Sequence, residues 1–64
     1  MNATKITWTW AAREEARKFG LNLADHRAAE DEATRRGLIN GEAIVLISDV
    51  MAVVRCRQAA EVAA

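Results

Sequence analysis

The sequence predicts a small single α+β domain with the order strand, helix, helix, strand, strand. Three observations support this prediction. Residues 5–10 alternate between apolar and polar side chains, residues 10–36 hold two segments of helical spacing, and residues 43–54 are apolar except at Ser48 and Asp49. The last run is shorter than the roughly 20 residues of a membrane span. We therefore expect it to form a hairpin in a three-stranded antiparallel sheet, with both short helices on one face.

The length of the chain limits the core that it can form. Sixty-four residues make one domain, residues 1–64, near the lower limit for a self-supporting core. A core of this size rarely supplies more than about 3–5 kcal/mol. Cys56 is the single cysteine, so no disulfide can form within the chain. A hydrophobic content of 52% is nevertheless typical of a globular chain rather than a disordered one.

The first strand is predicted at Lys5–Trp10. Ile6, Trp8 and Trp10 share one side of this segment, and two threonines share the other. β-branched and aromatic residues at a period of two are typical of a strand. We expect Trp8 and Trp10 to belong to the core, rather than to a surface that stacks on nucleic-acid bases.

Two helices are predicted next, at 10–19 and from 22 to about 36. Gly20 and Gly37 are well placed to end them, and Asn22 can cap the second with Asp25 at its third position. The inward stripe of the second helix consists of His26, Ala29 and Ala33. Because these side chains are mostly small, we expect this helix to lie close to the surface that it covers.

The hairpin is predicted to follow a turn at Asn40-Gly41, with strands 42–48 and 50–57. A two-residue loop at 48–49 defines a register with two apolar faces, and a slip of one residue would exchange them. One face carries Ala43, Val45, Ile47, Ala52, Val54 and Cys56; the other carries Ile44, Leu46, Met51 and Val53, bordered by Glu42, Arg55 and Arg57.

A competing interpretation makes Asp49 the cap of a long C-terminal helix. The three valines of this segment and the alternation of residues 55–57 favour the strand instead. The tail, residues 58–64, favours helix and is expected to form a last turn or to fray.

Two surfaces are predicted to bind a partner. Helices on one side of the sheet leave the second hairpin face uncovered, and an apolar centre with a charged rim is the usual layout of an interface. The residues of this patch are Ile44, Leu46, Met51, Val53, Arg55 and Arg57. The second surface is the acidic run Glu30, Asp31 and Glu32, which suits a basic groove that normally binds nucleic acid.

Residues able to carry out catalysis are few, and we expect that the protein is not an enzyme. It has one histidine, one cysteine, one serine and no tyrosine. We interpret His26 as a hydrogen-bonded residue near the seam of helix and sheet, Cys56 as a buried small apolar residue, and Ser48 as a turn residue. One cysteine and one histidine also predict no metal site, and no motif indicates a cofactor.

The charge balance disfavours general nucleic-acid binding. Nine basic residues match nine acidic ones, whereas proteins that bind nucleic acid usually carry a basic excess. A free cysteine and the lack of an apolar signal segment indicate a cytoplasmic protein without membrane attachment.

One segment, EEARKFGLNLADHRAAEDEATRRGLI at residues 14–39, resembles a helix-turn-helix of the winged, excisionase-like type. Ala16, Gly20 and Leu21 stand where such motifs have a small residue, a turn glycine and an apolar residue. The resemblance implies a DNA-binding regulator whose wing is the hairpin. The sequence departs from the motif at His26, where an aliphatic core residue is expected, and in the acids of the second helix.

The leading hypothesis is a small non-enzymatic interaction protein that binds and blocks the surface of a partner protein. Small inhibitors from phages and mobile elements, including anti-CRISPR proteins, work in this way, and the analogy rests on size and absent motifs. The expected partner is a nucleic-acid-binding bacterial complex or a second copy of the chain. The winged helix-turn-helix regulator is the alternative, with nucleic acid as the less favoured partner.

Overall fold

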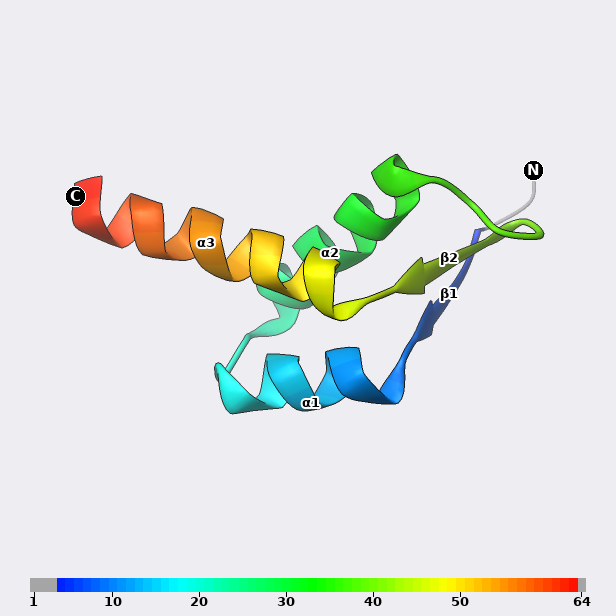
Figure 1. The fold of residues 1–64 in the computed structure, drawn as a ribbon. Helices are drawn as coiled ribbons and strands as arrows, with labels where there is room; N and C mark the ends of the chain where they lie inside the picture. Colours follow the sequence, from blue (N-terminus) through cyan, green and yellow to red (C-terminus); the bar gives the residue numbers. More distant parts are fainter. Residues whose placement is uncertain (1–3, 64) are drawn as a thin grey trace.

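The computed structural model describes residues 4–63 (Figure 1). Its elements are β1 (Lys5–Trp8), α1 (Trp10–Lys18), α2 (Leu23–Arg36), β2 (Glu42–Val45) and α3 (Ile47–Ala63). β1 and β2 form a two-stranded parallel sheet, in which Lys5 is opposite Glu42 and Trp8 is opposite Val45. The two helices between the strands make the long crossover that a parallel pair needs.

The predicted three-stranded antiparallel sheet with two helices is wrong, because residues 47–63 form helix α3. Oδ2 of Asp49 accepts a hydrogen bond from the backbone N–H of Leu46 at 2.8 Å, which satisfies a donor at the start of this helix. The backbone N–H of Val50 donates to the carbonyl of Leu46 at 3.2 Å. The competing interpretation had the correct secondary structure, with Asp49 inside the first turn rather than at the cap. The valines misled because packing overrides their modest strand preference.

Thr9 ends the pairing of β1 and begins α1. Its backbone N–H and its hydroxyl both donate to the carbonyl of Val45, each at 3.1 Å. Its Oγ1 also accepts from the N–H of Ala12 at 3.1 Å, as an N-cap residue does. The predicted first strand is therefore shorter than expected, and Trp10 belongs to α1 instead.

The boundary between α1 and α2 is confirmed. Gly20 has a φ of 63°, and the N–H of Leu21 donates to the carbonyl of Ala16 at 3.0 Å, so the chain leaves α1 through a left-handed residue. Asn22 and Asp25 form a reciprocal capping box at the start of α2, with bonds of 2.9 and 3.1 Å.

The predicted turn at Asn40-Gly41 is also confirmed. Both residues have positive φ values, 52° and 75°, as the central residues of a type I′ turn do. The N–H of Ile39 donates to the carbonyl of Glu42 at 2.9 Å, and the reverse bond is 3.0 Å long. This isolated antiparallel bridge directs the chain from α2 into β2.

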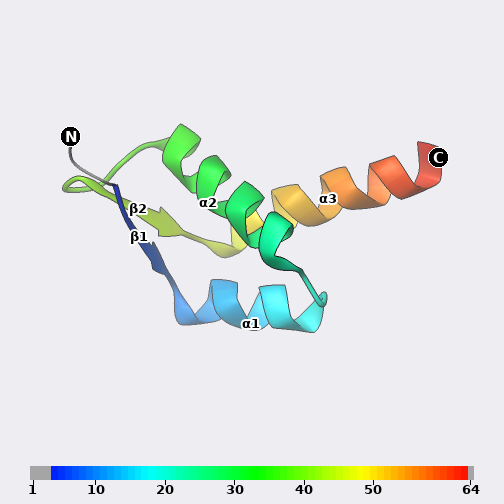
Figure 2. The same ribbon diagram turned by 180° about the vertical axis from the view of Figure 1, so that it is seen from behind.

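The core consists of small side chains. α2 packs against β2 and α3, and α1 packs against α3. Figure 2 shows from behind that the C-terminal part of α3 extends away from the other elements, as it does in Figure 1. In the described part of the chain the buried apolar residues are all alanine or valine: Ala12, Ala16, Ala29, Ala33, Ala43, Val45, Val50, Val53 and Val54. Helices and strands can therefore lie close together, but the area that each one buries is small.

An ion pair between the exposed Arg36 and the buried Asp49 connects α2 to α3. Asp49 is 5% exposed, and its carboxylate oxygens lie 3.3 Å from Nε and 3.0 Å from Nη2 of Arg36. Nη2 of Arg36 also donates to the carbonyl of Ile44. The hydrogen bond with Asp49 raises the pKa of Arg36 above its ordinary value, against the opposing effect of desolvation. Because the pKa of Arg36 is higher in the folded protein than in the unfolded chain, the ion pair contributes fully to stability below the unfolded pKa. This contribution is lost only as the pH rises through the pKa of Arg36 in the folded protein.

We expect Asp49→Ala to destabilise the fold by roughly 2 kcal/mol, because hydrogen bonds to a charged group are lost and Arg36 loses its carboxylate. Urea denaturation followed by circular dichroism measures the change. Asp31→Ala is the matched control, since Asp31 is an exposed acid on α2 and its removal should alter stability by less than about 0.5 kcal/mol. Equal effects of the two substitutions would contradict the role assigned to the ion pair.

Candidate functional site

A hollow lies between β1, α1 and the start of α2. Its volume is about 540 Å³, and it is lined by Trp8, Arg13, Arg17, Leu21 and His26. Pockets of roughly 300–1,000 Å³ are the usual size for small ligands or for the anchoring side chain of a partner. We call this feature the arginine hollow.

Trp8 forms a fixed wall of the arginine hollow. Its ring centroid lies 4.8 Å from that of His26, with 36° between the ring planes. Its Nε1 donates to Oε1 of Glu30 at 3.1 Å. His26 and Glu30 are one turn apart on α2, so both orient the indole of a residue held in the sheet. His26 lies at the seam of helix and sheet, as predicted, but within the described residues its side chain contacts the ring of Trp8 and does not make the hydrogen bond that was also predicted.

The opposite wall belongs to α1 and is cationic. Arg13 and Arg17 are four residues apart, and both are exposed. Nη1 of Arg17 is 4.0 Å from Oε1 of Glu14, a weak contact between solvated groups. Trp10 precedes Arg13 by one turn and is 76% exposed. These three side chains, Trp10, Arg13 and Arg17, follow one side of the helix, which we call the α1 face.

Basic side chains are far more exposed to solvent than acidic ones. All nine basic residues are exposed, whereas only Asp31 and Glu61 are exposed among the nine acidic ones. Most acids are partly buried and several have partners inside the fold, as Glu30 and Asp49 do. The outermost surface is therefore more positive than the zero net charge implies.

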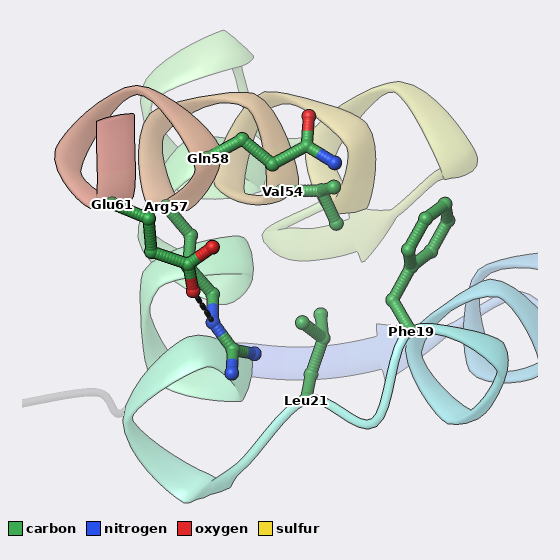
Figure 3. Close-up of a pocket in the computed structure, with 6 residues that line it drawn as sticks. All are labelled: Phe19, Leu21, Val54, Arg57, Gln58 and Glu61. Atoms are coloured by element: carbon green, nitrogen blue, oxygen red, sulfur yellow. Dashed lines mark ion pairs between the residues drawn. The ribbon is translucent and has the colours of Figure 1, made fainter.

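A second, smaller hollow lies between α3 and the connection from α1 to α2. Its volume is about 200 Å³. In Figure 3, Phe19 and Leu21 face Val54 of α3, and the ion pair of Arg57 and Glu61, at 3.5 Å, closes one end. We call it the α3 groove; its lining residues are Phe19, Leu21, Val54, Arg57, Gln58 and Glu61.

The three acids predicted as one surface point in different directions. Glu30 accepts the hydrogen bond from Trp8, and Glu32 pairs with Arg35 at 2.9 Å. Asp31 is exposed. Successive residues of a helix are rotated by about 100°, so a run of three acids cannot share one face.

The predicted apolar patch depended on a hairpin that does not form. Val53 is buried in the core, and Ile44 and Met51 are half-buried. Leu46, the residue before α3, is 37% exposed. The structure thus distributes these four residues over β2, the junction and α3, and their contact with a partner stays a prediction.

The two arginines predicted at the rim of that patch lie on α3. Arg55 is exposed, and Arg57 donates from Nη1 to Oδ2 of Asp25 at 3.3 Å. Cys56, between them, is exposed, so its predicted burial is wrong. Helical rather than strand periodicity separates these three side chains by about 100° each.

Trp10 is the surface residue that sequence reasoning missed. Its prediction as core is wrong, whereas that of Trp8 is right in part, since Trp8 is half-buried and packs against the core. The available signal was the helical pattern that begins at Trp10 itself. Counting Trp10 with the helix instead of the strand removes it from the inward side.

Within residues 4–63, no group of three or more His, Cys, Asp or Glu side chains is arranged to hold a metal ion. None of the helices in this range has the length and apolar character needed to cross a membrane. No protein-family model, curated protein or solved structure matches the chain. A functional proposal must therefore be argued from the surfaces themselves.

The two tryptophans should differ in their fluorescence. We expect a Trp10→Phe variant, which emits from Trp8 alone, to be less quenched by acrylamide and bluer than a Trp8→Phe variant, because Trp8 is half-buried and Trp10 is largely exposed. Circular dichroism of both variants controls for folding. Equal quenching of two folded variants would contradict the placement of Trp10 on the surface.

Proposed function

We propose that the protein is a non-enzymatic interaction protein that binds an acidic surface of a partner protein in the cytoplasm. The observation that supports this proposal is the composition of the α1 face, where an exposed tryptophan is followed by two exposed arginines. The exposure of all nine basic residues likewise favours a partner surface of negative charge.

Tryptophan and arginine are the residue types that most often dominate the energy of an interface. The Trp10 side chain has most of its surface available to be buried by a partner. The guanidinium groups of Arg13 and Arg17 can each donate two parallel hydrogen bonds to a carboxylate. The arginine hollow beside them offers a concave site for one side chain of the partner.

The role proposed for this contact is to block the bound surface. A chain of this size excludes other ligands from the area it covers, as small inhibitors of phages and mobile elements, including anti-CRISPR proteins, do; the link is an analogy of size. The acidic side chains do not form one surface, and the basic side chains are exposed. Both observations favour an acidic partner surface, rather than the basic groove expected from the sequence.

We expect Trp10→Ala and Arg13→Glu each to weaken partner binding by about tenfold or more, because each removes a central contact. The partner is captured from a bacterial lysate on the tagged protein, identified by mass spectrometry and purified, and its affinity is measured by calorimetry. Lys18→Glu is the matched control, since it makes the same charge change on another side of α1.

Unchanged affinity in both folded α1-face variants would exclude this surface as the binding site. A decrease of the same size in Lys18→Glu would instead indicate a general electrostatic effect, which is screened by salt. Repeating the titration at high ionic strength distinguishes that effect from a defined contact.

DNA binding is the second candidate. The observation that favours it is the connection of α1 to α2 through residues 19–22, as in a helix-turn-helix, combined with the exposed basic residues. Arg27 is exposed on α2, where such a motif contacts the groove. Leu23, which is 71% exposed, and Asp31 share the accessible surface of that helix and suit a phosphate backbone poorly.

A mobility-shift assay with random duplex DNA at low salt tests the second candidate. Under the protein-binding proposal we expect no tight complex with DNA, because α2 carries few basic residues and the net charge of the chain is zero. Tight, salt-sensitive binding that Arg27→Ala weakens would favour the regulator and contradict the leading proposal.

A further inference from the structure

The C-terminal half of α3 lies outside the packed fold. Among the residues whose burial the structure describes, Val54 is the last buried one, and residues 55–62 are all exposed. Figures 1 and 2 show this part of the helix extending away from α1 and α2. The contact of Arg57 with Asp25 at 3.3 Å holds the first turn of this half-helix. A helical segment of this length is marginal in water without packing, so it gains stability from any partner that covers it.

One side of this half-helix is suited to packing. Val54, Gln58 and Val62 are spaced by four residues and therefore follow the same side of α3. Val62 is 87% exposed, the highest value for a large apolar residue in the described part of the chain. Val54 and Gln58 also line the α3 groove, so this side of the helix, apolar at its two ends and polar at Gln58, runs directly into the groove.

The α3 groove combines an apolar floor with one charge of each sign. Phe19, Leu21 and Val54 provide the floor, and Arg57 and Glu61 stand beside it. A surface that carries both an acid and a base can be complementary to itself when it meets a copy related by a two-fold axis. The zero net charge of the chain also removes any long-range repulsion between copies.

We propose that the α3 groove binds the C-terminal half of α3 from a second copy of this chain, giving an antiparallel, two-fold symmetric dimer. An axis near Gln58 places Val62 of each copy opposite Val54 of the other, over the floor of its groove. It also brings Arg57 within reach of Glu61 of the second copy. This contact uses a different surface from the α1 face and does not depend on the function proposed above.

The first test is the oligomeric state. We expect sedimentation equilibrium to show a reversible dimer, and Val62→Asp to weaken it by about tenfold or more, because a charge replaces an apolar contact. Val62 is so exposed that the substitution leaves the monomer folded, which circular dichroism checks. Leu38→Asp is the matched control, because Leu38 is an exposed apolar residue of the connection between α2 and β2, and Figures 1 and 2 show this connection far from the end of α3.

The second test is positional. In a Cys56→Ser background, Gln58→Cys should oxidise readily to a disulfide-linked dimer, because the proposed axis places the two copies of residue 58 side by side. Leu38→Cys in the same background should not. A monomer at every concentration, or equal weakening by Val62→Asp and Leu38→Asp, would overturn the proposal. So would equal cross-linking at positions 58 and 38.

Discussion

The ion pair between Arg36 and Asp49 is the junction on which the fold depends. It connects the last residue of α2 to the first turn of α3, and the same guanidinium group binds the carbonyl of Ile44 in β2. The carboxylate also satisfies the N–H of Leu46. One buried acid therefore defines where β2 ends, where α3 begins and how both meet α2. The buried apolar residues of the described chain are all alanine or valine, and such small side chains interlock little. Apolar packing alone therefore does little to fix the positions of these elements.

The small core also explains the surface. Alanine and valine allow the helices to approach the strands closely, so the larger apolar side chains lie at the edge of the core or outside it. Trp10, Leu23 and Val62 are accordingly exposed, although a chain of this length has few apolar residues to spare. Acids are held close to the fold while arginines extend outward, because short carboxylate side chains reach only nearby donors and long arginine stems reach solvent. The candidate surfaces follow from this division.

Local signals were readable from the sequence, and long-range ones were not. The cap at Asn22, the stop at Gly20 and the turn at Asn40-Gly41 each depend on residues within a few positions, and each was predicted correctly. The state of residues 47–57 depends on Asp49 meeting Arg36, thirteen positions earlier in the chain, and no local pattern reports that contact. The arginine hollow was missed for the same reason, since it joins residues of β1, α1 and α2.

This chain has more apolar surface than it buries alone. As a hairpin, the segment after residue 43 would have left one sheet face uncovered; as a helix, it leaves its last turns uncovered. The two candidate surfaces nevertheless differ in chemistry. Contacts of the cationic α1 face are screened by salt, whereas contacts in the α3 groove rest mainly on apolar burial, which salt does not weaken. Ionic strength can therefore separate the two kinds of association in a single preparation of the protein, because it weakens contacts of the α1 face more than those of the α3 groove.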